Sequence, residues 1–143
     1  FDNYLVALRL KGLEIRESLE HGVSSLGEPA GRFPQVSGLR FTYSPSAPAG
    51  SRIREIIIGG GPLDPVKEYA VATHDFLIAG GDGYKAFSGA INTDNYGHLG
   101  GLLKSDRIIY NDASRWLRDV VIQYIQTNKK ITARVEGRIQ EIP

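Results

Sequence analysis

The sequence predicts an α+β fold in which helices pack on a mixed or mostly antiparallel β-sheet. Short β-forming segments occur near both ends of the chain and in its middle. Two other segments repeat apolar residues at three- and four-residue spacing, which indicates helices. Because the two kinds of element are interspersed along the chain, we expect a single α+β domain over residues 1–143.

The first predicted strand and helix lie close to the N-terminus. Residues 4–10 alternate in character and predict a strand that ends at the following Lys-Gly pair. Residues 13–22 predict a short helix, because Ile15 and Leu19 lie on one face and Gly22 suits the end of a helix.

The middle of the chain predicts three further strands separated by turns rich in glycine and proline. We expect these strands at residues 35–44, 53–58 and 68–73. Three consecutive glycines end the second of these three strands. The third leads into a loop over residues 76–84, and residues 84–87 begin a short helix.

The C-terminal part predicts the longest helix and a last strand. Residues 113–126 fit helical spacing throughout, with Asp112 as the N-cap. Before this helix, residues 90–101 are rich in Asn, Gly and Asp and are expected to be irregular. After it, residues 131–139 predict a strand that is interrupted at Gly137.

Composition excludes several classes of function. Of the 143 residues, 41% are hydrophobic and 23% are charged, which is ordinary for a soluble globular domain. A net charge of +1 gives no broad electrostatic support for binding a nucleic acid polymer or an anionic membrane. No apolar run approaches the ~18 residues of a membrane span, and the absence of cysteine excludes thiolate chemistry. Since the chain does not begin with methionine, we expect an excised, N-terminally truncated domain.

The most informative segment is the sequence Asp-Phe-Leu-Ile-Ala-Gly-Gly-Asp-Gly-Tyr at residues 75–84. It places the aromatic ring of Phe76 and the carboxylate of Asp82 on either side of Gly80 and Gly81. Because glycine has no side chain, a ligand can approach the backbone of this loop closely.

Four side chains predict a nucleoside clamp. Phe76 can stack on a flat base, and Phe1 can cover the other face of that base. Asp82 can accept hydrogen bonds from both hydroxyl groups of a ribose, and the amide of Asn3 can both donate to and accept from a base edge. The alternative is that the rings belong to the core and that Asp82 only forms a Gly-Asp-Gly turn.

Groups that cut bonds are not recognisable in the sequence. The histidines His21, His74 and His98 lack the spacing of a metal site, and no serine lies in a Gly-x-Ser-x-Gly motif. The three consecutive glycines lack the Gly-Lys-Ser/Thr ending of a phosphate-binding P-loop. We therefore predict no catalytic residue, no metal ligand, no cofactor and no phosphate site in this chain.

Several short motifs follow one another along most of the chain. They are Phe-Asp-Asn at residues 1–3, Leu-Lys-Gly at 10–12, Gly-Arg-Phe-Pro-Gln-Val-Ser-Gly-Leu at 31–39, Leu-Asp-Pro at 63–65, the loop at 75–84 and Val-Glu-Gly-Arg-Ile at 135–139. In this order they resemble the C-terminal domain of the secreted 5′-nucleotidases, a family that includes bacterial UDP-sugar hydrolases and animal ecto-5′-nucleotidase.

The resemblance implies a role for each candidate residue. In that family, this domain holds the substrate, and a separate N-terminal metallophosphoesterase domain, absent here, carries two divalent metal ions and an Asp-His dyad. By resemblance, Phe1 and Phe76 stack the base, Asp82 binds the ribose on a backbone opened by Gly80 and Gly81, and Asn3 contacts the base. The upstream Asn-Gly-Gly-Gly-x-Arg segment that grips phosphate in relatives is not in this chain.

The resemblance also implies the reaction and the location. The full-length protein is expected to hydrolyse nucleotides to nucleoside and phosphate in the periplasm, at the cell surface or outside the cell, and this fragment alone is expected to be inactive. Alternatives are the same architecture acting on 2′,3′-cyclic nucleotides, UDP-sugars or a thiosulfate-bearing carrier, and a non-catalytic binding module. The family loop often has Asn at the positions of His74 and Ala79, which leaves substrate preference open.

Overall fold

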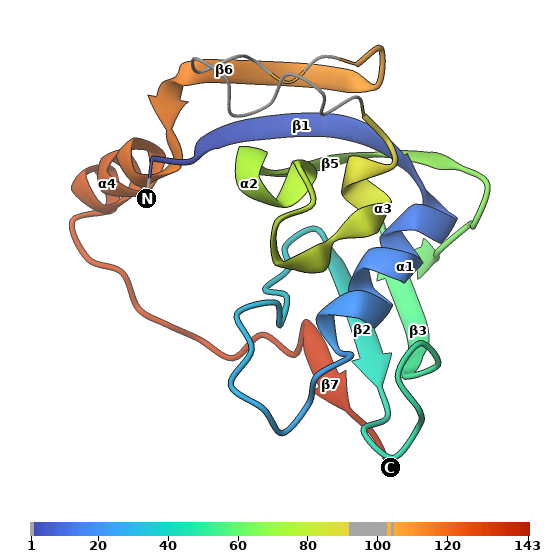
Figure 1. The fold of residues 1–143 in the computed structure, drawn as a ribbon. Coiled ribbons are helices and arrows are strands. Elements are labelled where there is room, and N and C mark those ends of the chain that lie inside the picture. Colours follow the sequence, from blue (N-terminus) through green and yellow to red (C-terminus); the bar gives the residue numbers. More distant parts are fainter. Residues whose placement is uncertain (1, 92–102, 104) are drawn as a thin grey trace.

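The computed structural model describes residues 2–91, 103 and 105–143 of the chain. These residues form two small β-sheets and four helices (Figure 1). The strands are β1 (Tyr4–Lys11), β2 (Leu39–Tyr43), β3 (Ile53–Ile58), β4 (Gly61–Pro62), β5 (Glu68–His74), β6 (Ile108–Trp116) and β7 (Ile139–Glu141). The helices are α1 (Gly12–Gly22), α2 (Asp75–Ile78), α3 (Lys85–Ser88) and α4 (Leu117–Asn128), with a 3₁₀ turn at Gly81–Gly83.

The first sheet has the strand order β5-β1-β6 and is antiparallel throughout. Strand β1 lies at its centre and alternates between the two faces of the sheet. The side chains of Val6, Leu8 and Leu10 are fully buried and form one wall of the core. The predicted first strand is therefore confirmed, and its inward face follows from the period of two.

The second sheet has the strand order β4-β3-β2-β7. Strands β3 and β4 form a tight hairpin through Gly59 and Gly60, whose φ angles of 62° and 86° are readily adopted only by glycine. The glycine run thus turns the chain back on itself. Strand β7 pairs with β2 in parallel, so this sheet is mixed, and the predicted α+β class is confirmed.

Helix α1 connects the two sheets, and α2 and α3 lie beside it beneath β1 and β5 (Figure 1). The buried carboxylate of Glu20 on α1 accepts hydrogen bonds from the backbone N–H groups of Arg52 and Ile53, at the start of β3. The apolar residues of α1, Ile15 and Leu19, enter the common core. These contacts fix the last turn of α1 relative to the start of β3.

The prediction of a helix over residues 113–126 is wrong at its N-terminal end. Residues 113–116 belong to strand β6, and the helix α4 begins only at Leu117. Asp112 is not an N-cap, because it lies within β6 and accepts hydrogen bonds from Ser114. The physical reason is that the backbone groups on the second edge of β1 need partners, and β6 pairs with this edge as far as Trp116, which lies opposite Tyr4 after a shift in register.

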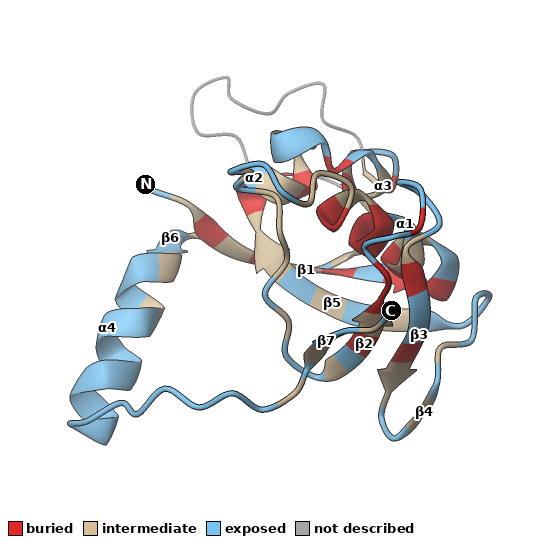
Figure 2. Cartoon of the chain, turned by 90° about the horizontal axis from the view of Figure 1, so that it is seen from below, coloured by how far each residue is buried: buried red, intermediate tan, exposed pale blue. Residues whose placement is uncertain are grey.

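The prediction of a strand over residues 131–139 is also largely wrong, since only Ile139–Glu141 forms β7. Residues 130–136 have no regular structure and are exposed. Every residue of α4 is described, and none is buried, so this helix projects from the core (Figure 2). The predicted irregular stretch at residues 90–101 lies mostly outside the described residues. Within those residues, no helix has the length and apolar character that crossing a bilayer requires.

Candidate functional site

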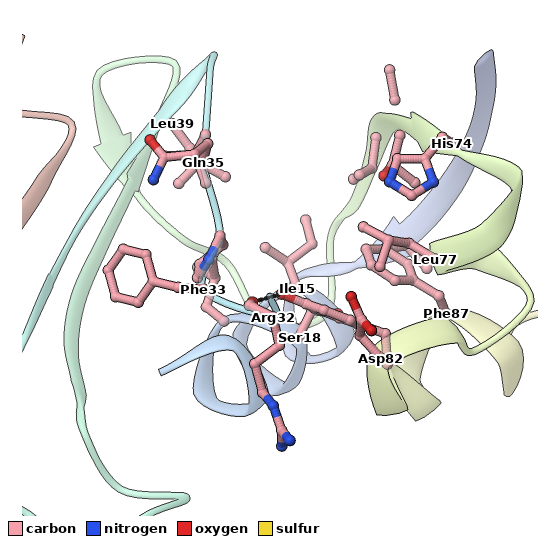
Figure 3. Close-up of a pocket in the computed structure, with 18 of the residues that line it drawn as sticks. Ile15, Ser18, Arg32, Phe33, Gln35, Leu39, His74, Leu77, Asp82 and Phe87 are labelled. Carbon is pink, nitrogen blue, oxygen red and sulfur yellow. Dashed lines mark hydrogen bonds between the residues drawn. The ribbon is translucent and has the colours of Figure 1, made fainter. Parts of the chain in front are cut away.

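A cavity of about 380 Å³ lies between the chain that follows β5 and the segment that precedes β2 (Figure 3). One wall carries His74, Leu77, Asp82 and Phe87, and the opposite wall carries residues 31–37 and Leu39. Its lining is mainly apolar with a few polar groups, as is typical of sites for small organic ligands.

The loop that carries this first wall is anchored at its beginning. Asp75, the first residue of α2, is buried, and its Oδ1 atom accepts hydrogen bonds from the backbone N–H of Tyr4 and from Nδ2 of Asn3, both at 3.0 Å. Three residues later, the fully buried Ile78 enters the core. These contacts join α2 to the first residues of β1 and fix where the following turn begins.

The turn itself holds Asp82 in an uncommon backbone conformation. Gly80 and Gly83 have φ angles of 90° and 85°, and Asp82 between them has a φ of 53°. The left-handed region is rarely occupied by residues other than glycine, although Asp and Asn tolerate it best. This turn directs the carboxylate of Asp82 toward the cavity (Figure 3). The turn-forming role and the ligand-binding role of Asp82 are therefore compatible.

Phe76 lies on the same loop but is not part of the cavity wall. Its ring is 42% exposed and lies nearly parallel to the ring of His74, with the centroids 6.1 Å apart and the planes 13° apart. A Cβ atom added at Gly81 would come within 2.4 Å of the Phe76 ring, and one added at Gly80 would meet Ser88 at 3.0 Å. A side chain at Gly81 would therefore displace the Phe76 ring, and the φ of 90° at Gly80 favours glycine there.

Tyr84 connects the two walls of the cavity. It is 5% exposed, and its hydroxyl donates a 2.6 Å hydrogen bond to the backbone carbonyl of Arg32. Burial, with a further contribution from the negative charge of Asp82, raises the pKa of Tyr84 to about 12. The hydroxyl therefore stays protonated and can donate at any physiological pH. The guanidinium of Arg32 itself points away from the cavity (Figure 3).

His74 contributes a neutral imidazole to the wall. Burial lowers the pKa of His74, and the nearby carboxylates of Asp75 and Asp82 oppose this shift only in part. Its Nδ1 atom is buried and has no hydrogen-bond partner among the described residues. The imidazole of His74 is therefore neutral near pH 7 and adds no positive charge beside the carboxylate of Asp82.

The predicted site residues are only partly brought together. Phe76, Gly80, Gly81 and Asp82 share one loop, and Asn3 is linked to the start of that loop through Asp75. One amide N–H of Asn3 is used in this link. Phe1 lies outside the described residues, so its distance from Phe76 stays a prediction.

Sequence reasoning missed the contributions of residues distant in the chain. The segment at residues 31–37 forms the opposite wall, and His21 contacts the backbone of Asp82. The only signal was that residues 31–39 carry one of the motifs in the family resemblance, which says nothing of where that motif lies in space. The described residues include no group of three His, Asp or Glu side chains that could hold a metal ion.

Comparison with known proteins gives consistent matches. The sequence profile of the family described as "5′-nucleotidase, C-terminal domain" matches residues 1–89, which include the whole loop at residues 75–84. The trifunctional nucleotide phosphoesterase protein YfkN of Bacillus subtilis is 33% identical over 147 aligned residues, with 99% of this chain and 9% of that protein covered. A snake venom 5′-nucleotidase from Macrovipera lebetinus is 31% identical over 140 aligned residues, with 92% of this chain and 30% of the relative covered.

Solved structures agree with the sequence matches. The crystal structure of a 5′-nucleotidase precursor from Thermus thermophilus superposes with a TM-score of 0.75 at 34% identity, and the match covers 99% of this chain and 25% of that chain. The chain thus spans at most 30% of the length of these relatives.

Proposed function

Because this chain belongs to the family of 5′-nucleotidase C-terminal domains, we propose that it binds the nucleoside part of the substrate in a larger phosphoric ester hydrolase. The larger enzyme would hydrolyse nucleotides to nucleoside and phosphate. The relatives named above are 5′-nucleotidases or a nucleotide phosphoesterase, which supports this class of substrate.

One observation carries the proposal: the carboxylate of Asp82 faces a cavity while an exposed aromatic ring, Phe76, lies on the same short loop. A carboxylate accepts two hydrogen bonds and donates none, which suits the vicinal hydroxyls of a ribose. The exposed ring offers a stacking face for a base, at roughly 1–3 kcal/mol per contact. Phe1 would supply the second ring, and Asn3, held by Asp75, would contact the base edge.

The chemical step is assigned to another part of the protein. Among the described residues, no group of three His, Asp or Glu side chains could hold a metal ion. We propose that two divalent metal ions sit in a separate catalytic domain and that this chain presents the substrate to it. We also propose a location in the periplasm, at the cell surface or outside the cell, in line with the relative named for snake venom.

Replacing Asp82 by Asn in the intact enzyme tests the ribose role. Asn is the right replacement because it tolerates the φ of 53° at this position, where Ala would add backbone strain. The loss of a charged acceptor should raise KM for a ribonucleotide at least about tenfold, because such hydrogen bonds are worth roughly 1.5–3 kcal/mol. An aryl phosphate that lacks ribose should keep its KM. Equal effects on the two substrates would refute the proposal.

The alternative in which the aromatic residues only pack the core is weakened for Phe76 by its exposure. The choice among 5′-monophosphates, cyclic nucleotides and UDP-sugars depends on groups that bind phosphate, and those groups are expected elsewhere in the enzyme. Comparing kcat/KM for the three substrate classes in the intact enzyme would show which class it prefers.

A further inference from the structure

We infer that His21 is a positioning residue that sets the direction of the Asp82 carboxylate, an inference that rests on the proposed function of Asp82 in binding ribose. His21 lies in the last turn of α1, sixty-one positions before Asp82 in the sequence. Its Nε2 atom is 2.8 Å from the backbone carbonyl oxygen of Asp82. Since a carbonyl oxygen only accepts hydrogen bonds, Nε2 carries the proton and donates it.

This hydrogen bond acts on the residue whose conformation matters most. Asp82 has a φ of 53° and a ψ of 15°, in a region that L-residues rarely adopt. The carbonyl group and the side chain of Asp82 are both attached through its Cα atom. When His21 holds the carbonyl on one side of the turn, the side chain is therefore held toward the cavity on the other.

Packing around the imidazole restricts its own position. The His21 ring contacts the Tyr84 ring edge to face, with the centroids 4.9 Å apart and the planes 76° apart. On another side, a Cβ atom added at Gly83 would come within 3.0 Å of Cε1 of His21. The imidazole is thus held between Tyr84 and the glycine that follows Asp82. A ring fixed in this way can serve as a rigid donor.

The same end of α1 also contacts the opposite wall of the cavity. A Cβ atom added at Gly22 would lie 2.7 Å from Pro34 and 3.0 Å from the Tyr84 hydroxyl, which itself donates to Arg32. The last turn of α1 therefore abuts both walls, and His21 is its contact with the wall that carries Asp82. This makes the separation of the two walls depend on one helical turn.

Two amide variants of the intact enzyme separate positioning from mere structural support. In His21→Gln the side-chain amide reaches as far as Nε2 of histidine, whereas in His21→Asn it is one methylene shorter. We expect His21→Asn to raise KM for a ribonucleotide roughly three- to tenfold, the effect of one lost hydrogen bond. His21→Gln should stay within about twofold of the wild type. Neither variant should change kcat/KM for an aryl phosphate without a ribose.

A third variant controls for changes on this helix. Glu17→Gln alters an exposed side chain one turn earlier on α1 and should leave both substrates unaffected. Combining His21→Asn with Asp82→Asn completes a double-mutant cycle. Because His21 acts through Asp82, His21→Asn should change the ribonucleotide KM by less than about twofold in the Asp82→Asn background.

The outcomes distinguish the two levels of the argument. If Asp82→Asn leaves the ribonucleotide KM unchanged, the proposed ribose role fails and the inference about His21 fails with it. If Asp82→Asn raises this KM but His21→Asn does not, only the inference about His21 is overturned. It is also overturned if His21→Asn impairs both substrates equally, if His21→Gln does not restore the KM, or if the effects of the two substitutions simply add.

Discussion

Asp82 lies in a tight turn and also lines the cavity, although sequence reasoning treats a turn-forming and a ligand-binding Asp82 as alternatives. A Gly-Asp-Gly segment commonly marks a turn, and here Asp82 does lie in a turn with left-handed backbone. The same conformation directs its carboxylate toward the cavity. The sequence identified this residue as a candidate from its neighbours alone. That Tyr84 and Arg32 join the walls around it could not be predicted, because no local pattern encodes a contact across 52 positions.

At the level of single residues, replacing Tyr84 by Phe should reduce stability and change its pH dependence. The loss of the hydrogen bond to the Arg32 carbonyl should cost about 1 kcal/mol near pH 7. The pKa of Tyr84 is raised to about 12 in the folded state, against an ordinary value of 10.0. The unfolded chain therefore loses this proton first, and the stability from Tyr84 declines as the pH rises from about 10 to about 12.

Urea unfolding of the wild type and of Tyr84→Phe at a series of pH values would measure this difference. The gap in unfolding free energy between the two proteins should narrow over that pH range. Tyr124→Phe, which removes the hydroxyl of a ring that is 59% exposed, is the matched control. A gap that stays constant from pH 8 to pH 12 would contradict the assignment of Tyr84 as a buried donor.

At the level of elements, the segment from α2 to α3 depends on glycines for internal packing. The sequence analysis expected a loop over residues 76–84, but this segment begins with helix α2 (Asp75–Ile78) and contains a 3₁₀ turn at Gly81–Gly83. It interpreted Gly80 and Gly81 as openings for a ligand. The structure adds that the ring of Phe76 occupies the space a side chain at Gly81 would need. The exposed position of Phe76 is therefore a property of the whole turn.

Gly81→Ala should consequently displace the ring of Phe76, because the added Cβ atom would lie 2.4 Å from it. In the intact enzyme we expect a several-fold increase in KM for ribonucleotides and little change for an aryl phosphate, since the stacking surface is worth roughly 1–3 kcal/mol. Gly61→Ala is the matched control, because a Cβ atom at Gly61 meets nothing within 4 Å. If the two alanine variants have the same ribonucleotide KM, Phe76 does not stack on the base.

The errors in predicting residues 113–116 and 131–138 have one physical cause. The spacing of Ala113 and Trp116 fits a helix, and sequence patterns alone therefore extended α4 toward the N-terminus. In the folded chain, these residues lie at the end of β6, which pairs with the open edge of β1 and places Trp116 opposite Tyr4 after a shift in register. Residues 131–138 likewise have strand-forming character, but only the residues next to β2 find a partner in a sheet. Elements with local signals, such as β1 and α1, were predicted well.

At the scale of the whole molecule, the site combines pieces from distant parts of the chain. Ile15, Ser18 and Leu19 of α1, the segment at residues 31–37 and residues of the segment after β5 line one cavity. Helix α4 projects away from them, and its apolar side chains Val121, Ile122, Tyr124 and Ile125 are exposed (Figure 2). This chain spans at most 30% of the length of the relatives named above, so the kinetic tests are designed for the larger hydrolase that we propose.

The most direct test of the account compares a ribonucleotide with its 2′,3′-dideoxy analogue in the intact enzyme and in Asp82→Asn. The wild type should prefer the ribonucleotide by about tenfold in KM, because only the ribonucleotide offers hydroxyl groups to the carboxylate of Asp82. In Asp82→Asn this preference should fall toward one. If the variant keeps the full preference of the wild type, Asp82 does not bind the ribose and the central claim is wrong.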